Sequence, residues 1–141
     1  MIAGYLLDTN ALSEPVAPKR NEAVVSWIRA LPQTSTYVSA LTMGEVRKGI
    51  HRLPQSLRRE ELRLWLENTL IEWFDDRIIS IDLAVADRWG KLVAEQSASP
   101  RPIIDCLLAA TAITHGLTLV TRDTDLVGIP GLEIFNPWAI N

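Results

Sequence analysis

Short apolar runs alternate with longer amphipathic segments along this chain. Runs rich in apolar and β-branched residues predict strands at residues 2–7, 36–39, 78–81, 117–121 and 132–135. Apolar residues that recur at helical spacing predict helices at residues 22–31, 40–53, 56–73, 82–97 and 103–114. Strands that alternate with helices favour an α/β fold, with a parallel sheet covered by helices on both faces.

Polar residues, prolines and glycines set the expected ends of these elements. Asn21 and Asp82 are typical N-caps, and Gly116 is a typical stop after a helix. Residues 11–14 have room for one helical turn before two prolines, and residues 97–102 predict a loop. The helix over 103–114 is almost wholly apolar, so we expect it to be central.

Composition narrows the class of protein. The chain has 141 residues, of which 48% are hydrophobic and 22% charged, so we expect one globular domain over residues 1–141. A net charge of −3 argues against a uniformly basic nucleic-acid coat but permits local basic patches. One cysteine and two histidines exclude a disulfide framework and a Cys- or His-rich metal site within one chain. Without a long apolar run or leader-like N-terminus, we expect a soluble cytoplasmic protein with no membrane partner.

Four acidic residues follow or interrupt the most apolar segments. Asp8 and Asp123 each follow a predicted strand, Asp105 lies inside the most apolar helix, and Glu45 lies early in the helix after strand 36–39. Ligands of open α/β sheets bind outside the carboxyl ends of the strands. We therefore expect these four side chains to converge on one edge of the sheet.

Each acid also has a structural interpretation. Asp8 could cap the following turn, Asp105 suits the first turn of a helix, residues 42–45 match a capping box, and Asp123 or Asp125 could form a turn. Together, however, gathered carboxylates repel one another and must bind a proton or a cation. Oxygen ligands without His or Cys suit Mg²⁺ or Mn²⁺, which serve phosphate chemistry.

The sequence around these acids resembles a known family. Four blocks in order look like the signatures of PIN-domain ribonucleases, at residues 6–10, 45–46, 102–110 and 120–123. Their order and spacing are similar to those of the VapC toxins of bacterial type II toxin–antitoxin systems. Residues 12–14 (Leu-Ser-Glu) and 135–138 (Phe-Asn-Pro-Trp) resemble the FitB-like branch. The resemblance covers essentially the whole chain.

The resemblance implies a single PIN-like domain with metal-dependent endoribonuclease activity. It further implies an RNA substrate, products with 5′-phosphate and 3′-hydroxyl ends, and a homodimer. A co-expressed antitoxin with a DNA-binding half would hold the toxin inactive, in a higher assembly.

The acids acquire roles from this resemblance. Asp8 and Asp105 resemble the central metal ligands, and Glu45 resembles the third acid, which positions metal or water. Asp123 resembles the fourth acid, which acts through water or a second metal. Thr121 resembles a residue that orients the cluster.

Further residues resemble supporting positions. Thr9 and Asn10 resemble hydrogen-bonding partners of the first acid. Many relatives carry another Asp three residues after the fourth acid, where this chain has Leu126, with Asp125 one residue earlier. Membership of Asp125 in the site is therefore left open. Arg122 is equally consistent with a phosphate contact and a surface ion pair.

Other interpretations remain open at this point. A non-catalytic PIN-fold module that binds RNA or protein would use the acids as caps, and a PIN nuclease of structured DNA would keep the metal. A dense basic stretch is consistent with an RNA track, a solvated face or an antitoxin surface (Arg47, Lys48, Arg52, Arg58 and Arg59). The helix that carries Trp65 and Trp73 is our candidate interface. We expect both histidines (His51 and His115) to be structural or exposed, and Cys106 to be a small, inert core residue.

Overall fold

The strands form one parallel sheet. The computed structural model describes residues 4–96 and 101–139. Within that part of the chain, five strands pair in the order β3-β2-β1-β4-β5, and every pairing is parallel. The strands are β1 (Gly4–Leu7), β2 (Thr36–Ser39), β3 (Ile78–Ile79), β4 (Leu117–Val120) and β5 (Ile134–Phe135).

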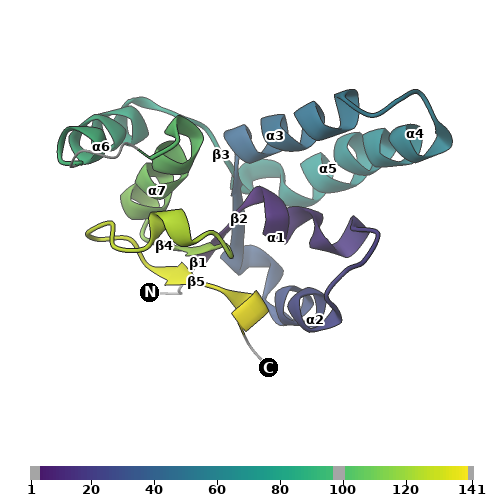
Figure 1. Ribbon diagram of the computed structural model, residues 1–141, viewed down its shortest axis with the longest axis horizontal. Coiled ribbons are helices and arrows are strands. Elements are labelled where there is room, and N and C mark those ends of the chain that lie inside the picture. Colours follow the sequence, from purple (N-terminus) through teal and green to yellow (C-terminus); the bar gives the residue numbers. More distant parts are fainter. Residues whose placement is uncertain (1–3, 97–100, 140–141) are drawn as a thin grey trace.

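Helices cover both faces of this sheet (Figure 1). They are α1 (Thr9–Ser13), α2 (Glu22–Ala30), α3 (Ala40–His51), α4 (Leu57–Leu64), α5 (Ile71–Phe74), α6 (Leu83–Ala94) and α7 (Ile103–His115). A π-helical segment, Trp65–Leu70, joins α4 to α5 without a break. The structure therefore confirms the predicted α/β class with helices on both sides of a parallel sheet.

Two apolar cores lie on opposite faces of the sheet. One packs α1, α3 and the π-helical segment against β1, β2 and β4, with Leu7, Val38 and Val120 buried in it. The other packs α6 and α7 against β1 and β4 through Leu6 and Leu119. Alternate residues of β1 and β4 thus face different cores, which is why these strands are apolar throughout.

Predicted helix ends are confirmed where a capping side chain defines them. The Asn21 side chain accepts hydrogen bonds from the Ala23 and Val24 N–H groups. Asp82 accepts from Val85 N–H at 3.0 Å. Gly116 adopts the left-handed conformation at φ 65°, as a residue that ends a helix requires.

Several predicted boundaries are wrong by a few residues. Strand β3 stops at Ile79 because Asp82 already caps the next helix, and β5 begins only at Ile134. Helix α3 ends at His51 and α6 at Ala94. The starts of the predicted first strand (residues 2–3) and of the predicted loop (97–100) lie outside the described residues.

None of the helices within residues 4–96 and 101–139 has the length and apolar character needed to cross a bilayer.

Candidate metal centre

Strand pairing places the first acid beside Thr121. Leu7, the last residue of β1, pairs with Val120, the last residue of β4. The Asp8 N–H group continues this ladder and donates to the Val120 carbonyl at 3.1 Å. The chain leaves β1 toward β2 on one side of the sheet, whereas β4 lies on the other, so this position is the crevice where open α/β sheets bind ligands.

Asp8 is buried and firmly oriented. Only 8% of the residue is exposed. Its carboxylate caps α1 by accepting a hydrogen bond from Ala11 N–H at 2.8 Å, and it is also hydrogen-bonded to the Thr121 side chain. Burial raises the pKa of Asp8, and the charge of Asp123 adds to this effect, whereas the two hydrogen bonds and Arg122 oppose it. The predicted capping role and a place in the acidic site therefore occur together in one residue.

Three further carboxylates lie close together beside it. One carboxylate oxygen from each of Asp105, Asp123 and Asp125 lies within 4.8 Å of the others. Asp105 stands in the first turn of α7. Asp123 caps the short turn that follows β4 by accepting from Asp125 N–H at 2.9 Å, so the turn itself sets these two acids side by side.

Asp105 experiences the charge of every other acid at this edge. Burial raises its pKa most, followed by repulsion from Asp123, Asp125, Asp8 and Glu45 in that order. These five carboxylates therefore form one electrostatic unit, which we call the acidic cluster.

Glu45 is the outlying member of the acidic cluster. It lies on α3, and its carboxylate forms an ion pair with Lys48 at 2.8 Å. The capping-box interpretation of residues 42–45 is wrong, because α3 begins at Ala40 and Ser39 is its cap. The Glu45 side chain is consequently in the second turn of the helix and does not cap its end.

Thr121 connects two members of the acidic cluster. Its side chain is hydrogen-bonded to Asp8, and its hydroxyl oxygen accepts from Asp123 N–H at 3.0 Å. Only 1% of Thr121 is exposed. The predicted support from Thr9 and Asn10 is not seen, because neither side chain makes a hydrogen bond to Asp8 in the described part of the chain, and Asn10 is exposed. The Asp8 carboxylate is held instead by Ala11 N–H of α1 and by Thr121.

Two side chains at the rim have positions that the sequence left open. The Arg122 guanidinium lies over the Trp138 ring, 5.0 Å from its centroid. It makes no ion pair with a carboxylate of the described residues, so the surface ion-pair interpretation is wrong. Asp125 belongs to the close carboxylate group. The signal for it was its place two residues after a turn-forming Asp123, which sets both side chains on the same turn.

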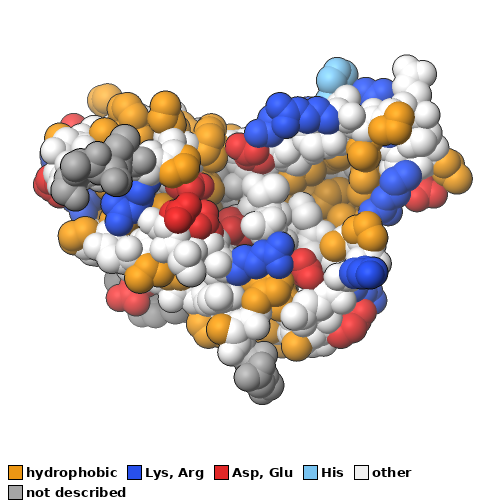
Figure 2. Space-filling view, in the orientation of Figure 1, with side chains coloured by type: hydrophobic (Ala, Val, Ile, Leu, Met, Phe, Trp, Pro, Cys, Tyr) orange, Lys and Arg blue, Asp and Glu red, His pale blue; other side chains and the backbone are white. Residues whose placement is uncertain are grey.

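The donor set of the acidic cluster fits a hard divalent cation. All five side chains offer carboxylate oxygens, and their mutual repulsion is what a cation relieves. Cys106 is buried and accepts from the Gln96 side chain instead. Figure 2 shows Asp and Glu side chains gathering in the hollow between the α7 side of the molecule and α3, and Lys and Arg side chains along α3 and α4.

A parallel sheet covered by helices, with carboxylates gathered beyond the ends of its central strands, places the chain among the open α/β domains that carry their site at this edge. Residues 5–132 match the PIN domain family, and the chain belongs to that family.

Similar proteins span the chain almost from end to end. It is 36% identical over 135 residues to "Toxin FitB" of Neisseria gonorrhoeae, covering 94% of this chain and 97% of the toxin. It is 35% identical to "VapC ribonuclease Y4jK" of Sinorhizobium fredii, covering 94% and 96% of the two chains. Its fold matches the crystal structure of FitAcB from Neisseria gonorrhoeae with a TM-score of 0.89, at 36% identity and covering 96% of this chain and 99% of the other. The family predicted from the sequence is thus confirmed.

Proposed function

We propose that this protein is a metal-dependent endoribonuclease and the toxin of a type II toxin–antitoxin module. The observation that carries the proposal is the acidic cluster. Carboxylate oxygens of Asp105, Asp123 and Asp125 lie within 4.8 Å of one another, and burial, followed by the charges of the other four carboxylates, raises the pKa of Asp105. Such a concentration of like charge costs stability unless a cation is bound. The names of the relatives, a ribonuclease and a toxin, support the choice of reaction and role.

The proposed metal ligands are Asp8, Asp105, Glu45 and Asp123, and Asp125 joins them on the evidence of its position. A bound Mg²⁺ or Mn²⁺ would polarise a phosphoryl oxygen and supply a nucleophilic water at neutral pH. The chain itself contributes orientation. Ala11 N–H and Thr121 fix the Asp8 carboxylate, and Asp125 N–H fixes that of Asp123.

Arg122 is the proposed contact for a substrate phosphate at the rim. Its guanidinium is a planar fork of donors that matches phosphate oxygens, and it makes no ion pair with a described carboxylate. Stacking on Trp138 limits its motion, and its charge already acts on Asp8, so it faces the acidic cluster.

The partners follow from the toxin role. We propose RNA as the substrate, a homodimer as the active form, and an antitoxin with a DNA-binding half as the inhibitor, all in the cytoplasm. We also propose that residues 1–141 form a single PIN domain.

A charge-neutral substitution tests the proposed reaction. Asp105→Asn keeps the shape of the side chain and removes one charge from the acidic cluster. Asp87→Asn is the matched control, because Asp87 lies on α6 with 64% of its side chain exposed and pairs only with Lys91 in the described structure. With Mn²⁺ and a labelled single-stranded RNA, we expect Asp105→Asn to lose about 100-fold or more of the cleavage rate. Asp87→Asn should cleave normally.

The same assay separates the competing functions. Full cleavage by a folded Asp105→Asn protein would refute the proposed site, with folding checked by circular dichroism. Cleavage of structured DNA in preference to RNA would favour the DNA nuclease. No cleavage by the unsubstituted chain and no stabilisation by Mn²⁺ would favour a non-catalytic binding module.

A further inference from the structure

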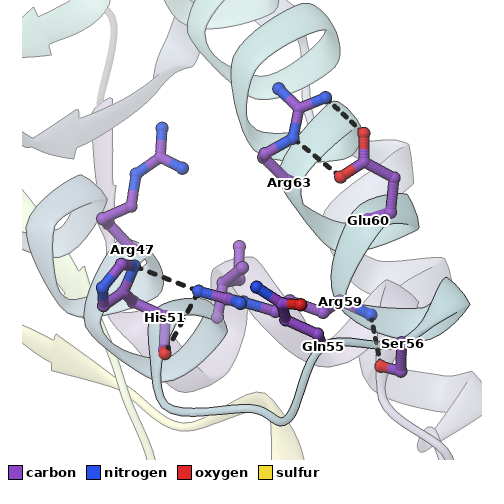
Figure 3. Close-up of a pocket in the computed structure, with 8 residues that line it drawn as sticks. Arg47, His51, Gln55, Ser56, Arg59, Glu60 and Arg63 are labelled. Carbon is purple, nitrogen blue, oxygen red and sulfur yellow. Dashed lines mark hydrogen bonds and ion pairs between the residues drawn. The ribbon is translucent and has the colours of Figure 1, made fainter.

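A cavity of about 500 Å³ opens between α3 and α4, away from the acidic cluster. Figure 3 shows basic side chains from both helices pointing into it. Its walls are Arg47, Ile50, His51, Gln55, Ser56, Arg59, Glu60 and Arg63. Most of the polar groups in this lining are hydrogen-bond donors, which is typical of a site for an anion.

This region is positive in an otherwise acidic protein. Residues 47–63 contain six of the 14 Lys and Arg residues but two of the 17 Asp and Glu residues. The other parts of the chain therefore hold eight basic and 15 acidic residues. The positive charge is thus local, in line with the blue side chains along α3 and α4 in Figure 2.

Arg59 is held in place without a carboxylate partner. Its Nη2 atom lies 3.3 Å from His51 Nδ1 and 3.5 Å from the His51 carbonyl oxygen (Figure 3). Among the described residues, no carboxylate lies within ion-pair distance of its guanidinium, and Nε and Nη1 make no hydrogen bond. Since an arginine only donates, His51 Nδ1 is the acceptor in this contact. The Nε and Nη1 donors of Arg59 are therefore available to an anion.

The remaining charges in the cavity are unequally committed. Arg63 is neutralised, because it binds Glu60 through two hydrogen bonds and Glu67 through a third. Within the described ranges, the ion pair that Arg47 makes is a long one, with Glu67 at 3.7 Å. Arg47 and Arg59, one from each helix, are therefore the two cations best able to bind an added anion.

We propose that this cavity binds a backbone phosphate of the RNA, several residues along α3 from the acidic cluster. The proposal rests on the proposed ribonuclease function. Without a bound cation the acidic cluster repels phosphates, so a cationic anchor beyond Arg122 would strengthen the hold on the RNA. Helix α3 carries both Glu45 and His51, about 9 Å apart along its axis, so one strand of RNA can reach both. Guanidinium groups are well suited to phosphate oxygens.

Removal of one guanidinium tests the phosphate site. The probe is a 5′-labelled single-stranded RNA, and its binding in EDTA is followed by fluorescence anisotropy from low to moderate salt. We expect Arg59→Gln to weaken binding about 10-fold. We also expect the slope of log affinity against log salt to fall by about 0.7, the value for one lost phosphate contact. Arg47→Gln should act in the same direction, and Arg59→Lys should recover part of the loss.

The control is Arg29→Gln, which removes an exposed arginine from α2 and should change neither quantity. If Arg59→Gln fails to fold, Arg47→Gln carries the test. Wild-type affinity and salt slope in both folded variants would overturn the phosphate site, while cleavage by the unsubstituted chain with Mn²⁺ would leave the proposed function standing. The RNA-phosphate site would also be overturned if these variants bound inorganic phosphate or an antitoxin more weakly but bound RNA as the unsubstituted protein does.

Discussion

Asp105→Asn should stabilise the metal-free protein while it inactivates the proposed enzyme. Carboxylate oxygens of Asp105, Asp123 and Asp125 lie within 4.8 Å of one another. At that separation, two unit charges repel by about 1 kcal/mol in water and about 3 kcal/mol at an effective dielectric constant near 20. Because Asp105 is only half-buried and solvent screens it, we expect a net gain of about 1–2 kcal/mol. In a domain of this size that raises the melting temperature by roughly 3–6 °C.

A bound cation should reverse this order. Unsubstituted protein gains about 2.7 kcal/mol when Mn²⁺ is present at 100 times its dissociation constant. The Asp105→Asn variant lacks one ligand, so it gains less at the same concentration. The melting temperatures of the two proteins should therefore cross between EDTA and excess Mn²⁺, as followed by circular dichroism.

Asp87→Asn provides the baseline for this comparison, since its exposed carboxylate pairs with Lys91 on α6. It should show the same Mn²⁺ response as the unsubstituted protein. An Asp105→Asn protein that is no more stable in EDTA, or that gains as much from Mn²⁺ as the unsubstituted chain, would refute the argument that repulsion within the acidic cluster is relieved by a cation.

Three further outcomes follow from the same structure. Burial raises the pKa of both Asp8 and Asp105, so the folded protein binds more protons than the unfolded chain. Without metal, their contribution to stability should be complete below pH 3.8, the ordinary pKa of the group, and lost as pH rises through the raised pKa values of the folded state. Melting temperatures measured across pH should depend less on pH in Asp105→Asn. Thr121→Val removes a hydrogen-bond partner from the Asp8 carboxylate and from Asp123 N–H, so it should lower the free energy of unfolding, measured with urea, by about 1–3 kcal/mol. Thr121→Ser keeps the hydroxyl and should be close to the unsubstituted protein. Gly116→Ala should lower the free energy of unfolding by about 1 kcal/mol, because φ is 65° at this position. Gly90→Ala inside α6 should raise it by about as much, because an added Cβ meets no atom within 4 Å there.

The sequence predicted those parts of the fold that local interactions determine. Strand β2 and the start of α7 match their predicted bounds, because β-branched and aromatic residues favour the strand and Pro102 sets the start of the helix. Boundaries that depend on packing were missed. The two-residue strand β3 is as long as its pairing with β2 allows, and no pattern in residues 78–81 reveals where that pairing stops.

The sequence predicted an acidic edge of the sheet, but not how its acids are held. It left Asp125 open, although Asp125 belongs to the close carboxylate group, whereas Asp8 and Glu45 lie outside that group. Convergence follows from topology, since Asp8 and Thr121 come directly after paired strands. The partners of Asp8 do not follow from topology. Whether a neighbouring hydroxyl, such as that of Thr9, or the distant Thr121 reaches the carboxylate depends on side-chain direction, which is set only when β1 and β4 pair.

Opposite charges at two places along α3 explain how an acidic protein could bind a polyanion. Glu45 belongs to the acidic cluster, whereas Arg47 and His51, which line the cavity between α3 and α4, follow it by two and six residues. A divalent cation adds two positive charges at the first place and none at the second. Metal should therefore control contact of RNA with the acidic cluster, while salt controls its contact with the cavity. Because the two effects act at separate places, loss of the cavity should raise KM more than it lowers kcat, and loss of Asp105 should do the reverse.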